Sequence, residues 1–125
     1  MGRIFDQLRV NHHSLYVLFD SGSRNSYVRA SAADVGTVAH FKHPFLTEIG
    51  GSKHRIRETC ALQGTLRGKL VTLTAYVLPE IGDDGTGRAI DVIFGAHAMQ
   101  DFGIRLIPES EEVDLTHYHR ELYEV

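Results

Sequence analysis

The chain has 125 residues, of which 42% are hydrophobic and 23% charged, and its formal net charge is −3. These values predict one globular domain and exclude a disordered chain and a basic nucleic-acid-binding surface. No apolar run is long enough to cross a bilayer. A single cysteine, Cys60, excludes an internal disulfide and indicates a reducing compartment. Because residues 1–14 are polar and lack a signal-peptide segment, we expect a cytoplasmic protein without nucleic-acid or membrane partners, whether whole or a fragment of a longer chain.

The first strong structural signal is an apolar run from Leu15 to Phe19 that ends at Asp20. The run predicts a buried strand, and the small residues of Ser21-Gly22-Ser23 predict a turn directly after it. Such residues leave the carboxylate uncrowded and let backbone N–H groups approach it. Because burying a charge is costly without partners, Asp20 is the first candidate functional residue.

The middle of the chain alternates extended segments with turns. We expect strands or extended segments at 26–29, 46–49, 52–56, 59–63 and 70–78, and a short helical turn at 31–35. Gly50-Gly51 predicts a hairpin tip, and residues 67–69 predict a second turn.

The last third begins with a glycine- and aspartate-rich loop at 81–88 and an apolar run at 89–94. A short helix is expected at about 96–102, followed by a strand at 104–107. The tail at 108–125 is acidic, and Leu115, Tyr118 and Leu122 have the spacing of a short helix. Together these elements predict an all-β protein, a small closed β-barrel with one short helix.

Three of these features stand in an order that resembles the retropepsin-like aspartic proteases, specifically their single-domain bacterial members. They are Leu18-Phe19-Asp20-Ser21-Gly22-Ser23, the Gly50-Gly51 hairpin, and Val92-Ile93-Phe94-Gly95 before a helix and Gly103-Ile104-Arg105-Leu106. The resemblance covers about residues 10–107. It implies a single barrel domain of the retropepsin-like acid protease type over residues 1–125, with the acidic tail 108–125 outside its core.

The resemblance also implies a set of site residues. Asp20 would be the catalytic acid, and the triplet and the dimer axis would be supported by Ser21, Gly22 and Ser23. A flap over the substrate would be formed by Ile49, Gly50, Gly51 and Ser52. The loop packed beneath the triplet would consist of Ile93, Phe94 and Gly95. Ser21 replaces the commoner threonine but keeps its hydroxyl. Arg24-Asn25 stand where viral members carry acids that hold the substrate backbone, so viral substrate preferences do not transfer.

One acid is too few for this chemistry within one chain. Peptide hydrolysis by carboxylates needs one ionised acid to take a proton from water and one protonated acid to polarise the carbonyl. The sequence contains one such triplet, since Asp34-Val35-Gly36 and Asp84-Gly85-Thr86 do not match the pattern. We therefore expect a homodimeric aspartic endopeptidase that pairs two Asp20 residues across a two-fold axis, acts on peptides or proteins and uses no cofactor. The alternative is a non-catalytic dimeric peptide-binding or dimerisation module with the same fold.

Simpler interpretations remain open for several residues. Asp20 by itself is typical of an acid that caps its own turn, and Gly50-Gly51 is typical of an ordinary hairpin. Asp91 is interpreted as structural, and Cys60 as a small buried hydrophobe. The eight histidines include no His-Glu-x-x-His motif and no cysteine cluster, so no metal site is predicted.

Overall fold

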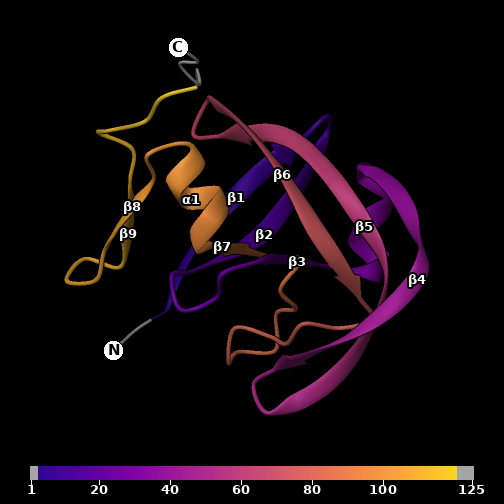
Figure 1. Ribbon diagram of the computed structural model, residues 1–125. Coiled ribbons are helices and arrows are strands. Elements are labelled where there is room, and N and C mark those ends of the chain that lie inside the picture. Colours follow the sequence, from indigo (N-terminus) through magenta and orange to yellow (C-terminus); the bar gives the residue numbers. More distant parts are fainter. Residues whose placement is uncertain (1–2, 121–125) are drawn as a thin grey trace.

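The computed structural model describes residues 3–120. Within them lie nine strands, one α-helix and one 3-10 helix (Figure 1). In chain order they are β1 (Ile4–Val10), β2 (His13–Asp20), β3 (Ser26–Arg29), the 3-10 helix η1 (Ala30–Val35), β4 (Thr37–Ile49), β5 (Ser52–Leu66), β6 (Lys69–Leu78), β7 (Val92–Gly95), α1 (Ala96–Asp101), β8 (Arg105–Ile107) and β9 (Glu112–Asp114). The all-β class is confirmed, and so is the single short α-helix.

Seven strands form one sheet in the order β1-β2-β7-β3-β6-β5-β4. A further antiparallel pairing joins β1 to β5 through Leu8 with Leu66 and Arg9 with Thr65. This pairing closes six of the strands into a ring, which leaves β4 as the outer strand. The remaining strands, β8 and β9, form a separate two-stranded sheet.

Strand β1 was not predicted from the sequence. Ile4, Leu8 and Val10 are buried, while Gln7 and Arg9 are exposed, so the apolar alternation is present but interrupted by Asp6. The strand exists because it pairs with β2 over its whole length, from Ile4 opposite Phe19 to Val10 opposite His13. A short, weakly patterned strand of this kind depends on its neighbour more than on its own sequence.

The core lies inside the ring. Among its most completely buried side chains are Val17, Val28, Cys60, Val71, Ala75, Val92 and Phe94. The same core includes Ile4, Leu8 and Val113, which lie outside residues 10–107. Cys60 is buried as predicted, and burial raises the pKa of its thiol, which donates to the carbonyl oxygen of Ala33 at 3.2 Å.

The β4–β5 hairpin is the longest arm of the structure. Its tip has Gly50 at φ 57° and Gly51 at φ 83°, and Ile49 pairs with Ser52 on either side. Two consecutive positive φ values are the requirement of the tight hairpin turn that glycine pairs favour, so the predicted tip is confirmed. Farther down, the register shifts between His40 and Phe45, which places a bulge in β4 opposite β5.

The predicted helix of the C-terminal tail is wrong in the part that the structure describes. Residues 115–120 form a turn, closed by the N–H of Tyr118 donating to the carbonyl of Leu115 at 3.0 Å, and no helix. The N–H of His119 donates instead to the carbonyl of Phe102, and the Tyr118 ring stacks on the Phe102 ring. The apolar spacing therefore serves contacts with the end of α1. Leu122 lies outside the described residues.

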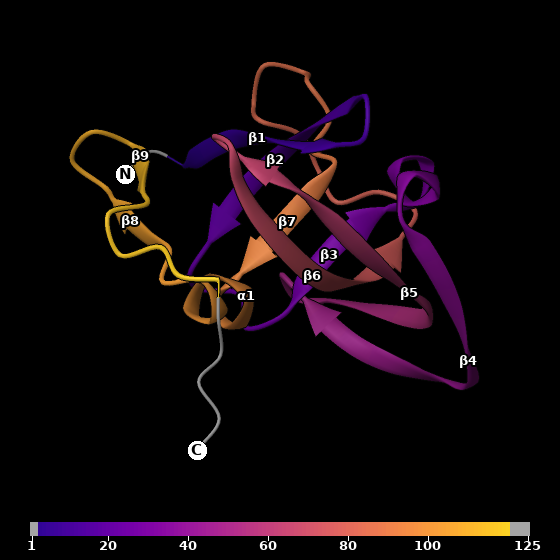
Figure 2. The ribbon, with the colours of Figure 1, turned by 90° about the horizontal axis from the view of Figure 1, so that it is seen from above.

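The two hairpins occupy opposite sides of the molecule (Figures 1 and 2). The β8–β9 sheet lies beside α1, and the β4–β5 hairpin extends on the far side of the ring. No helix within residues 3–120 has both the length and the apolar character that a membrane span requires.

Candidate active site

Asp20 is the last residue of β2 and the first residue of a tight turn. The N–H of Ser23 donates to the carbonyl of Asp20 at 3.1 Å, and the N–H of Gly22 donates to the Asp20 carboxylate oxygen Oδ1 at 2.9 Å. A Cβ on Gly22 would lie 3.2 Å from that oxygen. The expected approach of a backbone N–H to the acid is therefore confirmed, and it fixes the carboxylate against its own turn.

Strand β7 packs against this turn and supports it. Asp20 pairs in parallel register with Gly95, and a Cβ on Gly95 would meet the carbonyl oxygen of Asn25 at 2.2 Å. Only glycine fits that approach. The first two N–H groups of α1 then bond the turn itself, from Ala96 to the Ser23 carbonyl at 2.7 Å and from His97 to the Arg24 carbonyl at 3.2 Å.

Ser26 completes the support and was missed from the sequence. Its hydroxyl oxygen accepts a hydrogen bond from the N–H of Gly95 at 2.9 Å, and the residue is buried. A serine that opens an otherwise apolar strand, before Tyr27 and Val28, is the signal that identifies it, since a buried hydroxyl needs a partner.

Asp91 has the structural role that the sequence interpretation gave it. Its carboxylate forms an ion pair with the Arg29 guanidinium at 2.6 Å and accepts the N–H of Tyr16 at 2.8 Å. The pair ties β2 to β3 just before β7 begins, so Asp91 stabilises the sheet that carries Asp20 and does not face the groove.

A groove of about 420 Å³ runs between the Asp20 turn and the tip of the β4–β5 hairpin. Of the predicted flap residues, Ile49 and Gly50 line it, whereas Gly51 and Ser52 do not. Ile93 forms part of its wall and Phe94 is fully buried, so only the second of these packs beneath the turn. A smaller apolar pocket of about 190 Å³ adjoins the groove, lined by Tyr27, Ile49, His54, Leu78, Glu80, Ile81 and Ile93.

Asp20 also borders a second hollow on the side away from the hairpin. This depression of about 580 Å³ is lined largely by apolar side chains from β1, β2, α1, β8 and the residue before β8, among them Ile4, Leu18, Met99, Ile104 and Leu106. Ser21 is exposed at its rim, and within residues 3–120 its hydroxyl takes part in none of the side-chain hydrogen bonds. The depression was not predicted from the sequence, because it forms between segments far apart in the chain.

The histidines do not gather into a metal site. No group of three or more histidine, cysteine, aspartate or glutamate side chains with metal-binding geometry occurs in the described part of the chain. His40 instead lies 3.3 Å from the carboxylate of Glu58, across the β4–β5 pair.

Two solved structures have an architecture similar to that of this chain. The retroviral protease-like domain of Ddi1 from Leishmania major superposes with a TM-score of 0.66 at 14% identity, covering 93% of this chain and 90% of that one. The fold is retropepsin-like. The foamy viral protease-reverse transcriptase, solved in complex with an RNA/DNA hybrid, superposes with a TM-score of 0.53 at 11% identity over 78% of this chain and 12% of its own.

At sequence identities of 14% and 11%, the similarity to these two structures shows the fold alone. No protein-family model matches the sequence. No curated protein matches it either. The narrower assignment to single-domain bacterial members stays a prediction.

Proposed function

We propose that this protein is an aspartic endopeptidase whose catalytic pair consists of Asp20 from each of two identical chains. The observation that carries the proposal is the position of Asp20, held at the end of β2 by β7 and α1 and bordering the groove beneath the β4–β5 hairpin. A carboxylate held on a hydrogen-bonded turn and bordering a groove is the arrangement that peptide hydrolysis by general acid–base catalysis uses.

The proposed chemistry requires the two acids to differ in protonation. Two carboxylates a few Å apart cannot both ionise, so the pair shares one proton. The ionised Asp20 takes a proton from a water molecule, which attacks the scissile carbonyl, and the protonated Asp20 donates a hydrogen bond to the carbonyl oxygen. The Gly22 N–H that Asp20 already accepts would keep the carboxylate oriented through both steps.

Two features of the chain support a second copy as the source of the other acid. The Ser21 hydroxyl is exposed and is available to bond across a two-fold axis beside Asp20. The apolar depression on the same side offers a surface that a second copy would cover, as the interiors of stable homodimer interfaces are apolar. Such a two-fold interface uses the same surface on both copies.

The decisive experiment incubates a diverse peptide pool with the wild-type chain and with Asp20→Asn and Asp20→Ala at pH 4 to 8. Wild type is expected to cleave the pool, and both variants to lose at least about 100-fold in rate. Since Asp20 makes its hydrogen bond only to its own turn, both variants should keep the wild-type Tm and sedimentation. Cleavage by Asp20→Ala at the wild-type rate would overturn the assignment of the acid.

Mixed dimers test the sharing of the pair. A tagged wild-type chain combined with an untagged Asp20→Asn chain yields heterodimers with one acid. These should lose most of the activity of the wild-type dimer, because one carboxylate cannot both activate water and polarise the carbonyl. Full activity in purified heterodimers is incompatible with a shared pair.

A non-catalytic peptide-binding module is the second candidate. It is favoured by the observation that the groove and its adjoining pocket are present within one chain, so an extended peptide has a surface to bind without a second acid. Peptides that bind wild type and Asp20→Asn equally, and are cut by neither, would select this candidate.

A further inference from the structure

Arg24 is a cation of the groove that takes part in none of the described ion pairs. It lines the same groove as Asp20 and is exposed. None of the salt bridges, side-chain hydrogen bonds or cation–π contacts within residues 3–120 involves its guanidinium. By contrast, Arg29 and Arg67 each pair with an aspartate at less than 3 Å. The guanidinium of Arg24 is therefore free to bind a ligand in the groove.

The backbone of Arg24 is fixed although its side chain is exposed. The N–H of His97 at the start of α1 donates to the Arg24 carbonyl, and the N–H of Ala96 donates to the preceding carbonyl of Ser23. The same helix turn thus positions the arginine and the Asp20 turn together. A cation on an anchored backbone loses less freedom on binding than one on a mobile loop.

The distance from Asp20 to Arg24 limits which substrate residue can be reached. Residues 20–23 form a hydrogen-bonded turn, whose ends lie within about 7 Å, and one more residue adds at most about 4 Å between Cα atoms. Arg24 is therefore up to about 11 Å from Asp20 along the groove. At about 3.3 Å per residue of an extended peptide, about 11 Å between backbones corresponds to at most about three residues, and the length of the Arg24 side chain extends this reach to about four residues from the scissile bond.

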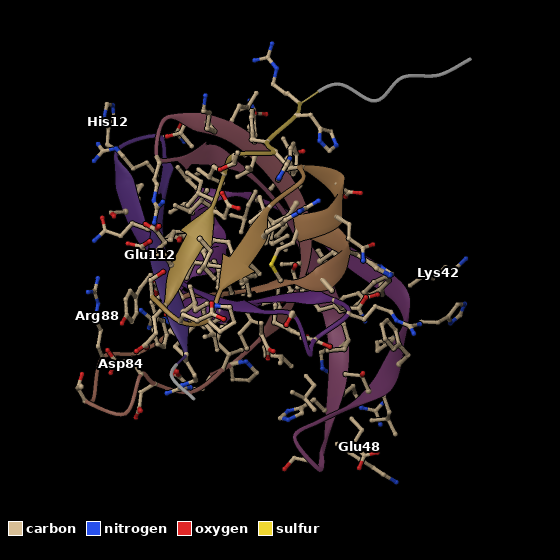
Figure 3. The ribbon with its side chains drawn as sticks, turned by 90° about the vertical axis from the view of Figure 1, so that its left-hand side faces the viewer. His12, Lys42, Glu48, Asp84, Arg88 and Glu112 are labelled. Atoms are coloured by element: carbon tan, nitrogen blue, oxygen red, sulfur yellow. The ribbon has the colours of Figure 1, made fainter. Side chains whose placement is uncertain are left out.

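Three charged side chains line the groove, the guanidinium of Arg24 and the carboxylates of Asp20 and Glu48. Lys53 lies directly opposite Glu48 in the β4–β5 register, so the two charges offset each other. The hairpin segment 37–58 carries four lysines and arginines (Lys42, Lys53, Arg55, Arg57) against two glutamates (Glu48, Glu58), a surplus of two positive charges in a chain of net charge −3. Figure 3 shows Lys42 projecting from this hairpin and Glu48 near its tip.

We propose that the groove selects peptides that carry an aspartate or glutamate two to four residues from the scissile bond, and that Arg24 recognises that carboxylate. The planar guanidinium presents paired N–H donors that match a carboxylate in a two-point contact. In a two-fold dimer the groove carries one Arg24 on each side of the catalytic pair, so an acid on either side of the cleaved bond is recognised. This specificity rests on the proposed endopeptidase function.

The test uses decapeptides with an apolar central pair and Glu, Gln or Lys at the second to fourth positions on either side. Wild type should cleave the Glu series about two- to five-fold faster than the Gln series in kcat/KM, with the Lys series slowest, as expected for one exposed ion pair. Arg24→Glu should reverse this order, and Arg24→Lys should retain it in weaker form. The preference should shrink as the ionic strength rises from about 0.05 to about 0.5 M.

Arg9→Glu is the matched control, since it makes the same charge change at an exposed position of β1 outside the groove. It should leave the order of the three series unchanged. Equal rates for all three series in wild type, or the same reversal in Arg9→Glu, would overturn the specificity while leaving the endopeptidase in place.

A binding measurement separates this inference from the function on which it rests. Fluorescence anisotropy of the labelled Glu, Gln and Lys peptides is measured on Asp20→Asn and on the double variant with Arg24→Glu. Tighter binding of the Glu peptide, reversed in the double variant, supports recognition by Arg24 through a readout that needs no catalysis. Absence of cleavage by wild type, by contrast, counts against the endopeptidase, and equal Kd values for the three peptides count against the recognition.

Discussion

Asp20 borders two hollows of different character. On the hairpin side, the groove is lined by small and polar turn residues, by Arg24 and by the glycine tip of β4–β5. On the other side, the depression is lined by Leu18, Met99 and other apolar side chains. A polar, glycine-flanked groove suits a chain that binds and leaves, whereas a fixed apolar hollow suits a partner that stays. Under the proposed function, Asp20 therefore lies between a surface that binds substrate transiently and a surface that a second copy covers permanently.

The two surfaces also differ in how firmly they are built. Ile4, Met99 and Ile104 of the depression are at least 94% buried and belong to the main core. The hairpin tip makes no such contacts, since a Cβ on Gly50 or Gly51 would have no neighbour within 4 Å. Segments with few packed neighbours open at low free-energy cost, so we expect motion on the groove side and rigidity on the depression side.

The largest effect is expected from Gly95→Ala, because Gly95 packs against the Asp20 turn, which borders both surfaces. The added Cβ would meet backbone atoms of Asn25 and Ser23, which cannot move without displacing the Asp20 turn. We expect a loss of about 1–3 kcal/mol in unfolding free energy, measured by urea denaturation, together with loss of cleavage. Gly85→Ala, at φ 90° in a loop where the added Cβ would meet only the Arg3 side chain at 4.0 Å, should cost only about 1 kcal/mol and keep activity. Equal effects of the two variants would contradict this role of Gly95.

Gln100→Trp should damage the depression side alone. Gln100 is exposed on α1 and lines the depression, so an indole there would occupy space that the proposed second copy would fill. The dissociation constant of the dimer, measured by sedimentation, should rise by about tenfold or more, and the cleavage rate should fall in proportion to the fraction of dimer. Gln63→Trp, an exposed site on β5, is the matched control and should sediment as wild type. Unchanged dimerisation in Gln100→Trp would remove the depression from the proposed interface.

Gly50→Val should damage the groove side alone. Gly50 has a φ of 57°, and an L-residue with a branched side chain there costs about 1–2 kcal/mol of hairpin stability. We expect about a tenfold lower kcat/KM with unchanged sedimentation. Gly68→Val places the same strain at φ 80° in the β5–β6 turn, away from the groove, and should leave kcat/KM near wild type. A similar loss of kcat/KM in both variants would show that the hairpin tip has no specific role in cleavage.

The smallest effect concerns the loop at 79–91, which supplies Ile81 to the pocket beside the groove. Hydrogen bonds from the Thr86 hydroxyl and N–H lower the pKa of Asp84 from 3.8 to about 2. A lowered pKa stabilises the folded state above pH 3.8, and this contribution disappears as the pH falls toward 2. Asp84→Asn should therefore show a flatter fall in Tm between pH 5 and 2 than wild type. Asp101→Asn removes a carboxylate outside this network and should retain the wild-type slope.

The predictable parts of the site were those that short stretches of sequence specify. The Asp20 turn, the Gly50-Gly51 tip and the glycine after Phe94 each follow from local residue chemistry, and the structure has all three as turns or close approaches. The Ser26 hydroxyl bond was missed because its partner, Gly95, lies far away in the sequence, and strand β1 was missed because its interrupted apolar pattern gives a weak signal without its pairing to β2. The tail helix was wrong because contacts with a distant segment compete with it: the N–H of His119 donates to the carbonyl of Phe102, and the Tyr118 ring stacks on the Phe102 ring.

The parallel pairing of β2 with β7 has a consequence for synthesis of the chain. Asp20 emerges early from the ribosome, but the residues that fix its turn, from Gly95 to His97, emerge some 75 residues later. Contacts so distant in sequence form late in folding. A nascent chain therefore carries Asp20 long before the residues that fix its turn are available, so under the proposed function no active site can form until most of the chain has been synthesised.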